Sequence, residues 1–482
     1  MPTFALHTYG CQMNVRDSDI LARRLRAKGL TEAETEEEAD VVIVNSCSVR
    51  GKAEDKALGK LGLLCATKRD RPNRVIGLTG CMAQRLGADI FKKLPRLSFS
   101  VGPRAESLIP QFVERCLETG AEQLCDFEVR DAPPETPEMA SADLSRLDCL
   151  NQGKKADKAD DEPVVTVAAG PVQSFVTILY GCSRRCSYCI VPSVRGEEQS
   201  RNPRDILLEV KAEATRGVRD VCLLGQSVMR YGLSRFQWPE DIPSPAGYTE
   251  PMPRLLEYIA REVPEIPRIR FTSGHPNGVT AELVHAMANI PAVCPHLHLP
   301  MQSGSDRILK EMNRGYDSAT YLDAVRRLRT AIPDIAITTD IIVGYPDETE
   351  ADFEATRRVM EEADFDNSFI FKYSPRPGTR SALLEDSVSD EEKCRRDAIL
   401  LADQDARGLR NNARWVGRIV EVLCEGPSLR NAARWAGRSP QNKIVLFEPD
   451  DSVRIGSFVR VRVKEAHAQT LYGDLVRNSS AV

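Results

Sequence analysis

Three cysteines stand within the nine residues of the stretch GCSRRCSYC, residues 181–189. Cys182, Cys186 and Cys189 follow the spacing C-x3-C-x2-C. Thiolates are soft ligands that favour zinc or iron–sulfur clusters. Structural zinc takes four closed ligands, generally as two C-x2-C pairs, and no second pair lies nearby. A [4Fe–4S] cluster held by three cysteines would leave one iron open, so the spacing indicates a site where a substrate or cofactor completes the coordination.

Three more cysteines occupy one repeated position near the start of the chain. A predicted strand runs into Cys11 (FALHTYGC), another into Cys47 (VVIVNSC) and a third into Cys81 (RVIGLTGC). A helix is expected after each strand, the first capped by Asp17 or Ser18. Alternating strands and helices indicate a parallel sheet, whose equivalent strand ends lie along one edge. We therefore expect Cys11, Cys47 and Cys81, here called the sheet triad, to meet.

Cysteine is also commonly buried as a small hydrophobic side chain. For any one member of the sheet triad, burial as a hydrophobic side chain would be the favoured interpretation. The position that all three share after a strand favours a role as ligands instead. The other cysteines show no such arrangement, and we expect them to be buried structural residues; they are Cys65, Cys116, Cys125, Cys149, Cys222, Cys294, Cys394 and Cys424.

The middle of the chain alternates about six strands with helices. The strands are expected at 175–180, 221–225, 268–273, 296–300, 336–345 and 369–374. Six are too few for a closed eight-stranded barrel, but they would form a partial one whose active site lies at the carboxyl ends of the strands. Cys182, Cys186 and Cys189 follow the first of these strands directly, and we call them the barrel triad.

By pattern the 482 residues divide into four segments. We predict an N-terminal parallel-sheet α/β domain over 1–118, a flexible linker over 119–170, a partial (β/α)6 barrel over 171–407 and a small all-β barrel over 408–480. The linker prediction depends on polar, proline-containing sequence with little apolar periodicity. In the last segment, short strands such as FVRVRV have a two-residue period. The expected fold class is α/β.

Charge and hydropathy indicate the setting of the protein. The net charge is −5, yet the segment from Arg410 to Val482 carries 12 Lys and Arg against 7 Asp and Glu. A basic end on an acidic body suggests that this end meets a polyanion. No apolar run approaches the ~20 residues of a membrane span, and the first residues lack the features of a signal peptide. We expect a cytoplasmic protein that does not bind membranes.

The motif of the barrel triad, with Tyr188 before its last cysteine, resembles that of the radical S-adenosylmethionine superfamily. Further stretches resemble the tRNA methylthiotransferases, and most closely the branch that makes 2-methylthio-N(6)-isopentenyladenosine beside the anticodon. The likeness covers nearly the whole chain outside the linker. The stretches that carry it are TYGCQMN, NSCSVR, TGCMAQ, GCSRRCSYCIVPSVRGEEQSR, HLHLPMQSGSDRILKEMNRGY and TDIIVGYPDETEADFE.

This resemblance implies two [4Fe–4S] clusters and S-adenosylmethionine as cofactors. The cluster on the barrel triad would bind S-adenosylmethionine and generate the radical that abstracts hydrogen from C2 of adenine. The sheet triad would hold the second cluster, which would carry the sulfur and deliver it after a second S-adenosylmethionine has methylated that sulfur. The implied reaction is methylthiolation of C2 of N(6)-isopentenyladenosine in the tRNA anticodon loop.

Five more residues are implied to bind the cofactor. Tyr188 stands beside the cluster, and Gly225 and Gln226 resemble the loop that meets the methionyl end of S-adenosylmethionine. Gln302 and Ser303 follow the fourth strand of the barrel and could reach the ribose or the base.

The basic end domain resembles the small RNA-binding barrel of this family, which is TRAM-like and OB-like. Its Arg460, Arg462 and Lys464 suit a β surface that follows a phosphate backbone. The expected partners are the tRNA anticodon stem-loop and an electron donor such as flavodoxin or ferredoxin, and we expect a monomer. Nearer the barrel triad, Arg195 could hold a phosphate or carboxylate, or form an ordinary ion pair.

Two alternatives stay open from the sequence. A methylthiotransferase of the same class could act on threonylcarbamoyladenosine in tRNA or on a ribosomal-protein aspartate, although the residues around Cys11 favour the isopentenyl branch. A non-catalytic iron–sulfur protein that binds RNA is an alternative of a different class. An open iron would then serve no purpose, and S-adenosylmethionine should not bind.

Overall fold

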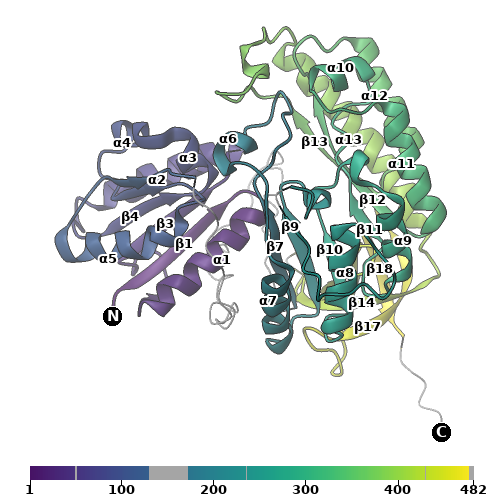
Figure 1. Cartoon of the computed structure of the whole chain (residues 1–482), viewed down its shortest axis with the longest axis horizontal. Coiled ribbons are helices and arrows are strands. Elements are labelled where there is room, and N and C mark those ends of the chain that lie inside the picture. Colours follow the sequence, from purple (N-terminus) through teal and green to yellow (C-terminus); the bar gives the residue numbers. More distant parts are fainter. Residues whose placement is uncertain (49–50, 130–171, 235, 429, 477–482) are drawn as a thin grey trace.

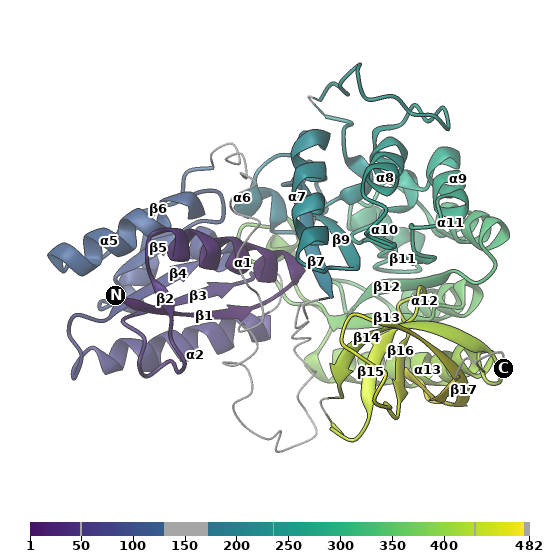
Figure 2. The ribbon, with the colours of Figure 1, turned by 90° about the horizontal axis from the view of Figure 1, so that it is seen from below.

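The structure is a computed structural model, which describes residues 1–48, 51–129, 172–234, 236–428 and 430–476. Two α/β units lie side by side, and a small β-barrel packs against the second of them (Figure 1). Seen from below, the small barrel covers one end of the second unit, away from the N-terminal unit (Figure 2).

The N-terminal domain is built on a six-stranded sheet in the order β2-β1-β3-β4-β5-β6. Every pair of neighbouring strands is parallel. All residues of the central strand β3 are buried, as expected for a parallel strand covered by helices on both faces. The strands are β1 Thr3–Tyr9, β2 Thr31–Glu32, β3 Val41–Ser46, β4 Val75–Thr79, β5 Phe99–Val101 and β6 Leu124–Asp126.

Helices cover both faces of this sheet, and each face has its own apolar core. Leu21 and Leu25 of one helix pack on one face together with Ile109 of another, whereas Leu61 and Leu64 pack on the opposite face. The arrangement confirms the predicted parallel α/β domain. The helices are α1 Gln12–Ala27, α2 Gly51–Thr67, α3 Cys81–Leu86, α4 Ile90–Lys93 and α5 Ile109–Thr119.

Two predicted boundaries in this region differ from the structure. Helix α1 begins at Gln12 with Cys11 as its N-cap, not at Asp17 or Ser18, because the Oδ1 atom of Asn14 accepts the Cys11 backbone N–H and closes the first turn earlier. Ordered structure also continues beyond residue 118, since β6 extends the sheet within the segment predicted as a linker. The remainder of that segment, from residue 130 on, lies outside the described residues.

The second unit contains all six predicted parallel strands. They form two sheets, β10-β9-β7-β8 and β11-β12-β13. A parallel bridge between Ile269 and Val293, and the bond from the Cys294 N–H to the Ile269 carbonyl, connect the two sheets into one curved wall. The strands are β7 Gln173–Tyr180, β9 Asp220–Gly225, β10 Arg268–Phe271, β11 His296–His298, β12 Ala336–Val343 and β13 Asn367–Lys372, with the short antiparallel β8 Gln199–Ser200 at one edge.

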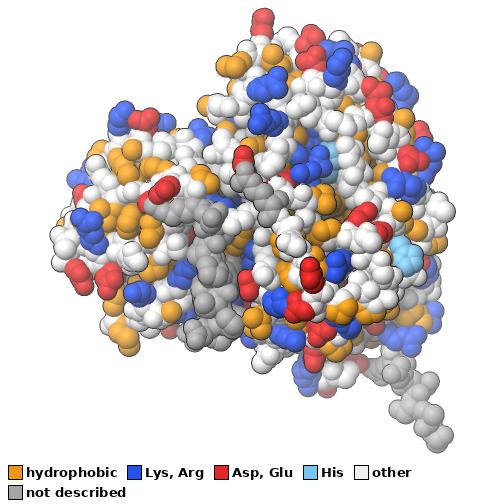
Figure 3. All heavy atoms as spheres, viewed as in Figure 1, with side chains coloured by type: hydrophobic (Ala, Val, Ile, Leu, Met, Phe, Trp, Pro, Cys, Tyr) orange, Lys and Arg blue, Asp and Glu red, His pale blue; other side chains and the backbone are white. Residues whose placement is uncertain are grey.

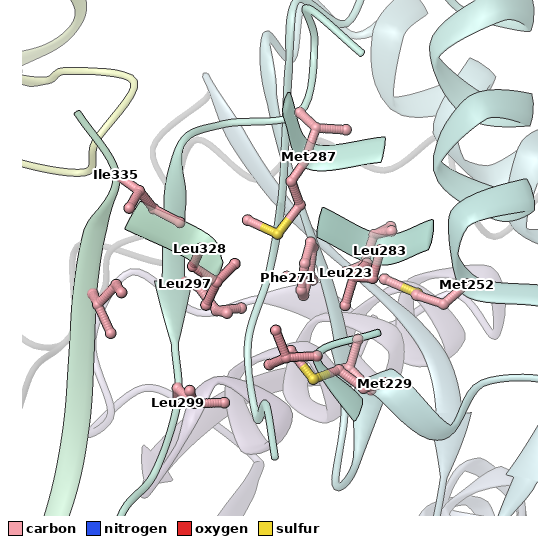
Figure 4. Packing of buried hydrophobic residues seen from close by; sticks show 14 of the residues in the cluster. Leu223, Met229, Met252, Phe271, Leu283, Met287, Leu297, Leu299, Leu328 and Ile335 are labelled. Atoms are coloured by element: carbon pink, nitrogen blue, oxygen red, sulfur yellow. The ribbon is translucent and has the colours of Figure 1, made fainter. Parts of the chain in front are cut away.

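Helices surround the outer face of this partial barrel and bury its largest core. Figure 4 shows Leu223, Phe271 and Leu297, from three successive strands, among Met252 and Met287 from the helices outside. This packing fixes the strands and therefore their carboxyl ends, where the barrel triad lies. The helices are α6 Val191–Arg195, α7 Pro203–Thr215, α8 Pro251–Glu262, α9 Ala281–Asn289, α10 Asp306–Glu311, α11 Ser318–Ala331, α12 Glu350–Ala363 and α13 Asp390–Ala413.

The C-terminal domain is a closed five-stranded barrel in the order β14-β15-β16-β18-β17. Arg268 and Arg270 of the partial barrel attach to it by donating to the backbone carbonyls of Arg438 and Ser439. Helix α13 runs across the predicted boundary at 407, because Asn412 is held by the carbonyl of His467 and the helix continues to Ala413. The strands are β14 Ile419–Pro427, β15 Trp435–Arg438, β16 Ile444–Phe447, β17 Phe458–Ala466 and β18 Thr470–Leu475.

Within the described part of the chain, no helix combines the length and the apolar character that a membrane crossing requires.

Candidate cluster sites at the domain junction

The sheet triad assembles at the ends of three neighbouring strands. Cys11 follows β1, Cys47 follows β3 and Cys81 opens helix α3 after β4, and these strands are adjacent in the sheet. The backbone N–H of Cys47 donates to the Tyr9 carbonyl at 2.8 Å, and the Cys11 and Cys47 side chains hydrogen-bond to each other. The predicted convergence of these strand ends is confirmed, whereas the role of the cysteines as ligands stays a prediction.

Two glycines allow this close approach. A Cβ atom on Gly10, whose φ is +147°, would lie 2.4 Å from the Cβ of Cys47. A Cβ atom on Gly80, at φ +91°, would lie 2.3 Å from Oδ1 of Asn45. Both backbones therefore require glycine immediately before the cysteine that each one positions.

The electrostatic surroundings of the sheet triad are uneven. The hydrogen bond from Cys47, helped by the Arg195 charge, lowers the pKa of Cys11 to about 6. Burial raises the pKa of Cys81, although Arg195 opposes that effect. The guanidinium Nε of Arg195 donates to Cys81 Sγ at 3.1 Å, and a terminal nitrogen binds the Asp17 carboxylate at 2.6 Å. One buried cation thus serves two members of the triad.

The barrel triad lies in the loop that follows β7. Gly181 at φ +69° lets the chain turn, because a Cβ atom there would lie 2.0 Å from the Glu197 carbonyl oxygen. The Cys182 N–H donates to the Gly196 carbonyl at 3.0 Å, and the Cys189 N–H donates to the Cys186 carbonyl at 3.2 Å. The loop is short and tied at both ends, which keeps the three cysteines of the barrel triad near one another.

Contacts from the far side of the barrel hold this loop. The hydroxyl of Ser187 donates to the Glu311 carbonyl at 2.9 Å, and its N–H donates to the Met312 carbonyl. Arg314, which is buried, donates to Cys186 Sγ at 3.2 Å and to the Tyr188 hydroxyl at 3.3 Å.

Burial sets the titration of this loop. It raises the pKa of Cys182, and it raises the pKa of Cys189 to about 12. The thiols of Cys182 and Cys189 would therefore stay protonated at neutral pH without a metal, whereas a bound metal would deprotonate them.

The other predicted cofactor residues differ in whether their polar side-chain atoms have partners. Gly225 ends β9, and neither side-chain polar atom of the buried Gln226 amide has a hydrogen-bond partner among the described residues. An unpaired buried amide fits a polar ligand such as the amino and carboxylate groups of S-adenosylmethionine. Ser303 differs, because its hydroxyl contacts Thr356 and accepts the Ser305 N–H.

Gln302 has a left-handed backbone at φ +73° and hydrogen-bonds to β12 through both its N–H and its carbonyl. A non-glycine residue in this conformation marks a constrained backbone position, consistent with a site at the strand ends.

Both triads lie where the two α/β units meet. Cys81 packs against Ile190 and Val194, which directly follow the barrel triad. On the other side, Cys11 and Met13 contact a small apolar cluster with Phe175 of β7. Lys and Arg side chains gather together with a histidine in the barrel domain on the face seen in Figure 3.

Each triad offers three thiols, the type of donor that iron–sulfur clusters use. Among the described residues, no group of three or more His, Cys, Asp or Glu side chains is arranged to hold a metal ion. Zn–S bonds of about 2.3 Å in a tetrahedron would require sulfurs roughly 3.8 Å apart. A [4Fe–4S] cluster is larger and binds each thiolate at a separate iron, so its ligands stand further apart. Two sets of three thiols near a buried arginine suit that group.

Comparison with protein families finds three matches along the chain. Residues 3–102 match a family described as "Uncharacterized protein family UPF0004", residues 176–360 match the Radical SAM superfamily, and residues 413–476 match the TRAM domain. The two matches with descriptive names agree with the predicted partial barrel and with the RNA-binding type of the end domain.

Two curated relatives each cover 98% of the chain. Each is named tRNA-2-methylthio-N(6)-dimethylallyladenosine synthase. The protein of Akkermansia muciniphila is 44% identical over 98% of this chain and 98% of its own length. That of Methylacidiphilum infernorum is 40% identical over 98% of this chain and 94% of its own length. The chain belongs to this synthase family. It is therefore a radical SAM enzyme whose cofactors are S-adenosylmethionine and [4Fe–4S] iron–sulfur clusters. The predicted family is confirmed.

A solved structure shares the fold of this synthase-family chain. The radical S-adenosylmethionine methyltransferase TsrM of Kitasatospora setae, with cobalamin and a [4Fe–4S] cluster bound, aligns with a TM-score of 0.55 and 14% identity. The alignment covers 80% of this chain and 77% of that one. At this identity the likeness concerns the fold alone.

Sequence reasoning missed two residues of these sites. The sequence predicts Asp17 only as a possible helix cap, and it gives no role to Arg314 in the stretch HLHLPMQSGSDRILKEMNRGY. Arg195 was named as a possible carboxylate ligand, and the carboxylate that it binds is that of Asp17. The available signal is charge alone, because nothing in the sequence shows which sulfur Arg195 or Arg314 reaches.

Proposed function

We propose that the chain methylthiolates C2 of N(6)-isopentenyladenosine in the tRNA anticodon loop, adjacent to the anticodon. The observation that carries the proposal is the presence of two cysteine triads at one domain junction, in a chain 44% identical to a named synthase over nearly its full length. A single triad would suffice for radical chemistry. A second set of thiols beside it supports a separate sulfur-carrying centre.

In this proposal each triad holds a [4Fe–4S] cluster, two in all. When bound, these clusters and S-adenosylmethionine supply the radical and sulfur chemistry that an unactivated aromatic C–H requires. The chain supplies position. The Gln226 amide is free to bind polar groups of the cofactor, and Tyr188 and Gln302 lie at the same end of the barrel.

Substrate binding is assigned to the C-terminal barrel and the junction together. Three basic residues occupy every second position of β17, and their side chains are exposed; they are Arg460, Arg462 and Lys464. This pattern suits contact with the phosphate backbone of the anticodon stem-loop. We further propose that the N-terminal α/β domain, the partial barrel and the C-terminal barrel are the functional divisions of the chain. We also propose a cytoplasmic location, a flavodoxin or ferredoxin as electron donor, and a monomeric enzyme.

The experiment is an anaerobic assay of the reconstituted full chain. It contains dithionite, S-adenosylmethionine and an anticodon stem-loop that carries N(6)-isopentenyladenosine, and mass spectrometry of the released nucleosides detects the product. We expect the methylthio nucleoside to appear with this stem-loop. A stem-loop with unmodified adenosine should give no product, because this RNA lacks the isopentenyl group that the enzyme recognises.

Two further substrates test the alternatives within the same reaction class. Product formed only on a stem-loop with threonylcarbamoyladenosine, or only on a ribosomal-protein aspartate, would refute the proposed substrate and keep the reaction. Failure to cleave S-adenosylmethionine at full iron content would refute the enzyme itself and favour a non-catalytic RNA-binding protein.

A further inference from the structure

One buried arginine connects the two α/β units at the sheet triad. Arg195 is the last residue of α6, shortly after the barrel triad, yet its side chain reaches the N-terminal domain. Its Nε donates to Cys81 Sγ at 3.1 Å, and its terminal nitrogen pairs with Asp17 of α1 at 2.6 Å. Arg195 and Asp17 are each 5% exposed, so salt and water screen this pair weakly.

The contact with sulfur goes beyond what an interdomain ion pair requires. Other buried pairs already connect α1 to α7, namely Arg16 with Glu209 and Arg23 with Glu213. A neutral thiol is a weak hydrogen-bond acceptor, whereas a thiolate forms a charge-assisted bond with a guanidinium. A planar guanidinium placed against Cys81 is therefore best matched to a sulfur that is ionised because it binds metal.

We propose that Arg195 is a positioning residue of the sheet triad, which fixes the Cys81 sulfur and, with Asp17, sets the reduction potential of the cluster held there. The inference depends on the proposed function, because it assumes a [4Fe–4S] cluster on that triad. Hydrogen bonds to the sulfurs and the local net charge both set such potentials. Reduction adds negative charge, so the Arg195 cation raises the potential and the Asp17 carboxylate lowers it.

A consequence follows for the division of labour between domains. The residue that tunes the N-terminal cluster comes from the barrel domain and lies six residues beyond the last ligand of the other cluster, Cys189. Any displacement of α6 would therefore change both sites at once. Ile190 and Val194, which pack on Cys81, keep the helix in place.

The test uses the full chain with Cys182→Ala, Cys186→Ala and Cys189→Ala, so that only the sheet triad can hold a cluster. Iron per chain is measured after anaerobic reconstitution, and the midpoint potential is measured by a redox titration followed by EPR. Arg195→Gln, Arg195→Lys and Asp17→Asn are then added one at a time. Arg23→Gln is the matched control, since it removes a buried interdomain arginine about 18 Å further along α1 from Cys11.

We expect opposite shifts. Arg195→Gln should lower the equilibrium constant for reduction about tenfold, or ~59 mV for a one-electron couple. Asp17→Asn should raise that constant about threefold, because Arg195 is then uncompensated. Arg195→Lys keeps the cation and should stay near the parent potential, and Arg23→Gln should leave the potential unchanged. A residue with a merely structural role would lower stability in each case without shifting the potential in two directions.

Each result decides one point. An unchanged potential in Arg195→Gln at full iron content would overturn the proposal. If Arg195→Gln loses its iron, Arg195→Lys decides: iron retained at the parent potential supports the electrostatic role, and any other result overturns it. Parent protein with far fewer than about four irons per chain would instead refute the cluster on the sheet triad, which is a failure of the proposed function.

Discussion

The sheet triad and the barrel triad reach similar surroundings from different local structure. The barrel triad comes from one loop, whereas the sheet triad comes from three strand ends between residues 11 and 81. Yet both include a cysteine that directly follows a glycine at positive φ, and both have one sulfur that accepts from a buried arginine. The recurrence indicates that each site needs a tight backbone approach and a fixed cation, whatever fold supplies them.

The two arginines differ in compensation. Arg195 is paired with the Asp17 carboxylate. Among the described residues Arg314 has no carboxylate partner, and it donates to hydroxyls, a backbone carbonyl and Cys186. The barrel triad thus lies beside a full positive charge, which favours an anionic ligand such as the carboxylate of S-adenosylmethionine. The sheet triad lies beside a nearly neutral pair.

Removal of a barrel-triad ligand should have the largest effect and would test whether this triad alone generates the radical. Cys182→Ala is expected to abolish both the cleavage of S-adenosylmethionine and the methylthio product, because every later step depends on that cleavage. Chromatography of 5′-deoxyadenosine and of the tRNA nucleosides measures the two activities. Cleavage that persists in this variant would end the assignment of the barrel triad.

Removal of a sheet-triad ligand should separate the two activities. We expect Cys11→Ala to keep most of the cleavage of S-adenosylmethionine and to lose the methylthio product, since the barrel triad stays intact. The same two measurements apply. Cys125→Ala is the matched control, because Cys125, contrary to the expectation that it is buried, is an exposed cysteine of β6 in the same domain. Equal loss of both activities in Cys11→Ala would contradict separate roles for the two triads.

The local parts of this comparison could be predicted from sequence. All six barrel strands and the convergence of the sheet triad were predicted, because apolar periodicity marks strands and parallel strands share an edge. Boundaries were less accurate. Helix α1 starts early because the Asn14 side chain accepts the backbone N–H of its N-cap, Cys11. Helix α13 continues past residue 407 because Asn412 is anchored to a strand hairpin far along the chain.

The side-chain contacts around the sulfurs could not be predicted. Arg314 reaches Cys186 across 128 positions of sequence, and Arg195 reaches Cys81 across 114. Such pairs depend on how two domains or two ends of a barrel pack, which no local pattern encodes. Ser303 shows the converse: its place after a strand suggested a ligand contact, and packing instead directs its hydroxyl to Thr356.

The difference in compensation can be tested at Arg314. In a chain that lacks the sheet triad (Cys11→Ala, Cys47→Ala and Cys81→Ala), Arg314→Gln should lower the equilibrium constant for reduction of the barrel cluster about 30-fold. A unit charge about 8 Å away contributes about 2 kcal/mol at an effective dielectric constant of 20. A redox titration followed by EPR measures the midpoint potential of the barrel cluster. Arg314→Lys should recover most of the loss, and a shift no larger than that of Arg195→Gln would contradict the role assigned to Asp17.

The smallest effects are expected at the glycines before the two triads. Gly10→Ala and Gly181→Ala should each lower the free energy of unfolding by about 1–3 kcal/mol, because both combine a positive φ with a close contact. Urea titration of the iron-free chain measures this change. Gly29→Ala is the control for backbone strain alone, since its φ is +84° and its Cβ would meet no atom within 4 Å.

Iron content then distinguishes the two glycines. The added methyl at Gly10 would press on the Cβ of Cys47, a sheet-triad residue, whereas at Gly181 it would press on the Glu197 backbone. We therefore expect Gly10→Ala to lose iron selectively from the sheet triad, as seen when the barrel triad is removed in the same chain. Gly181→Ala should retain that iron. If both variants kept full iron at both triads, close backbone approach would not be what the two sites share, and the buried arginines alone would remain as their common feature.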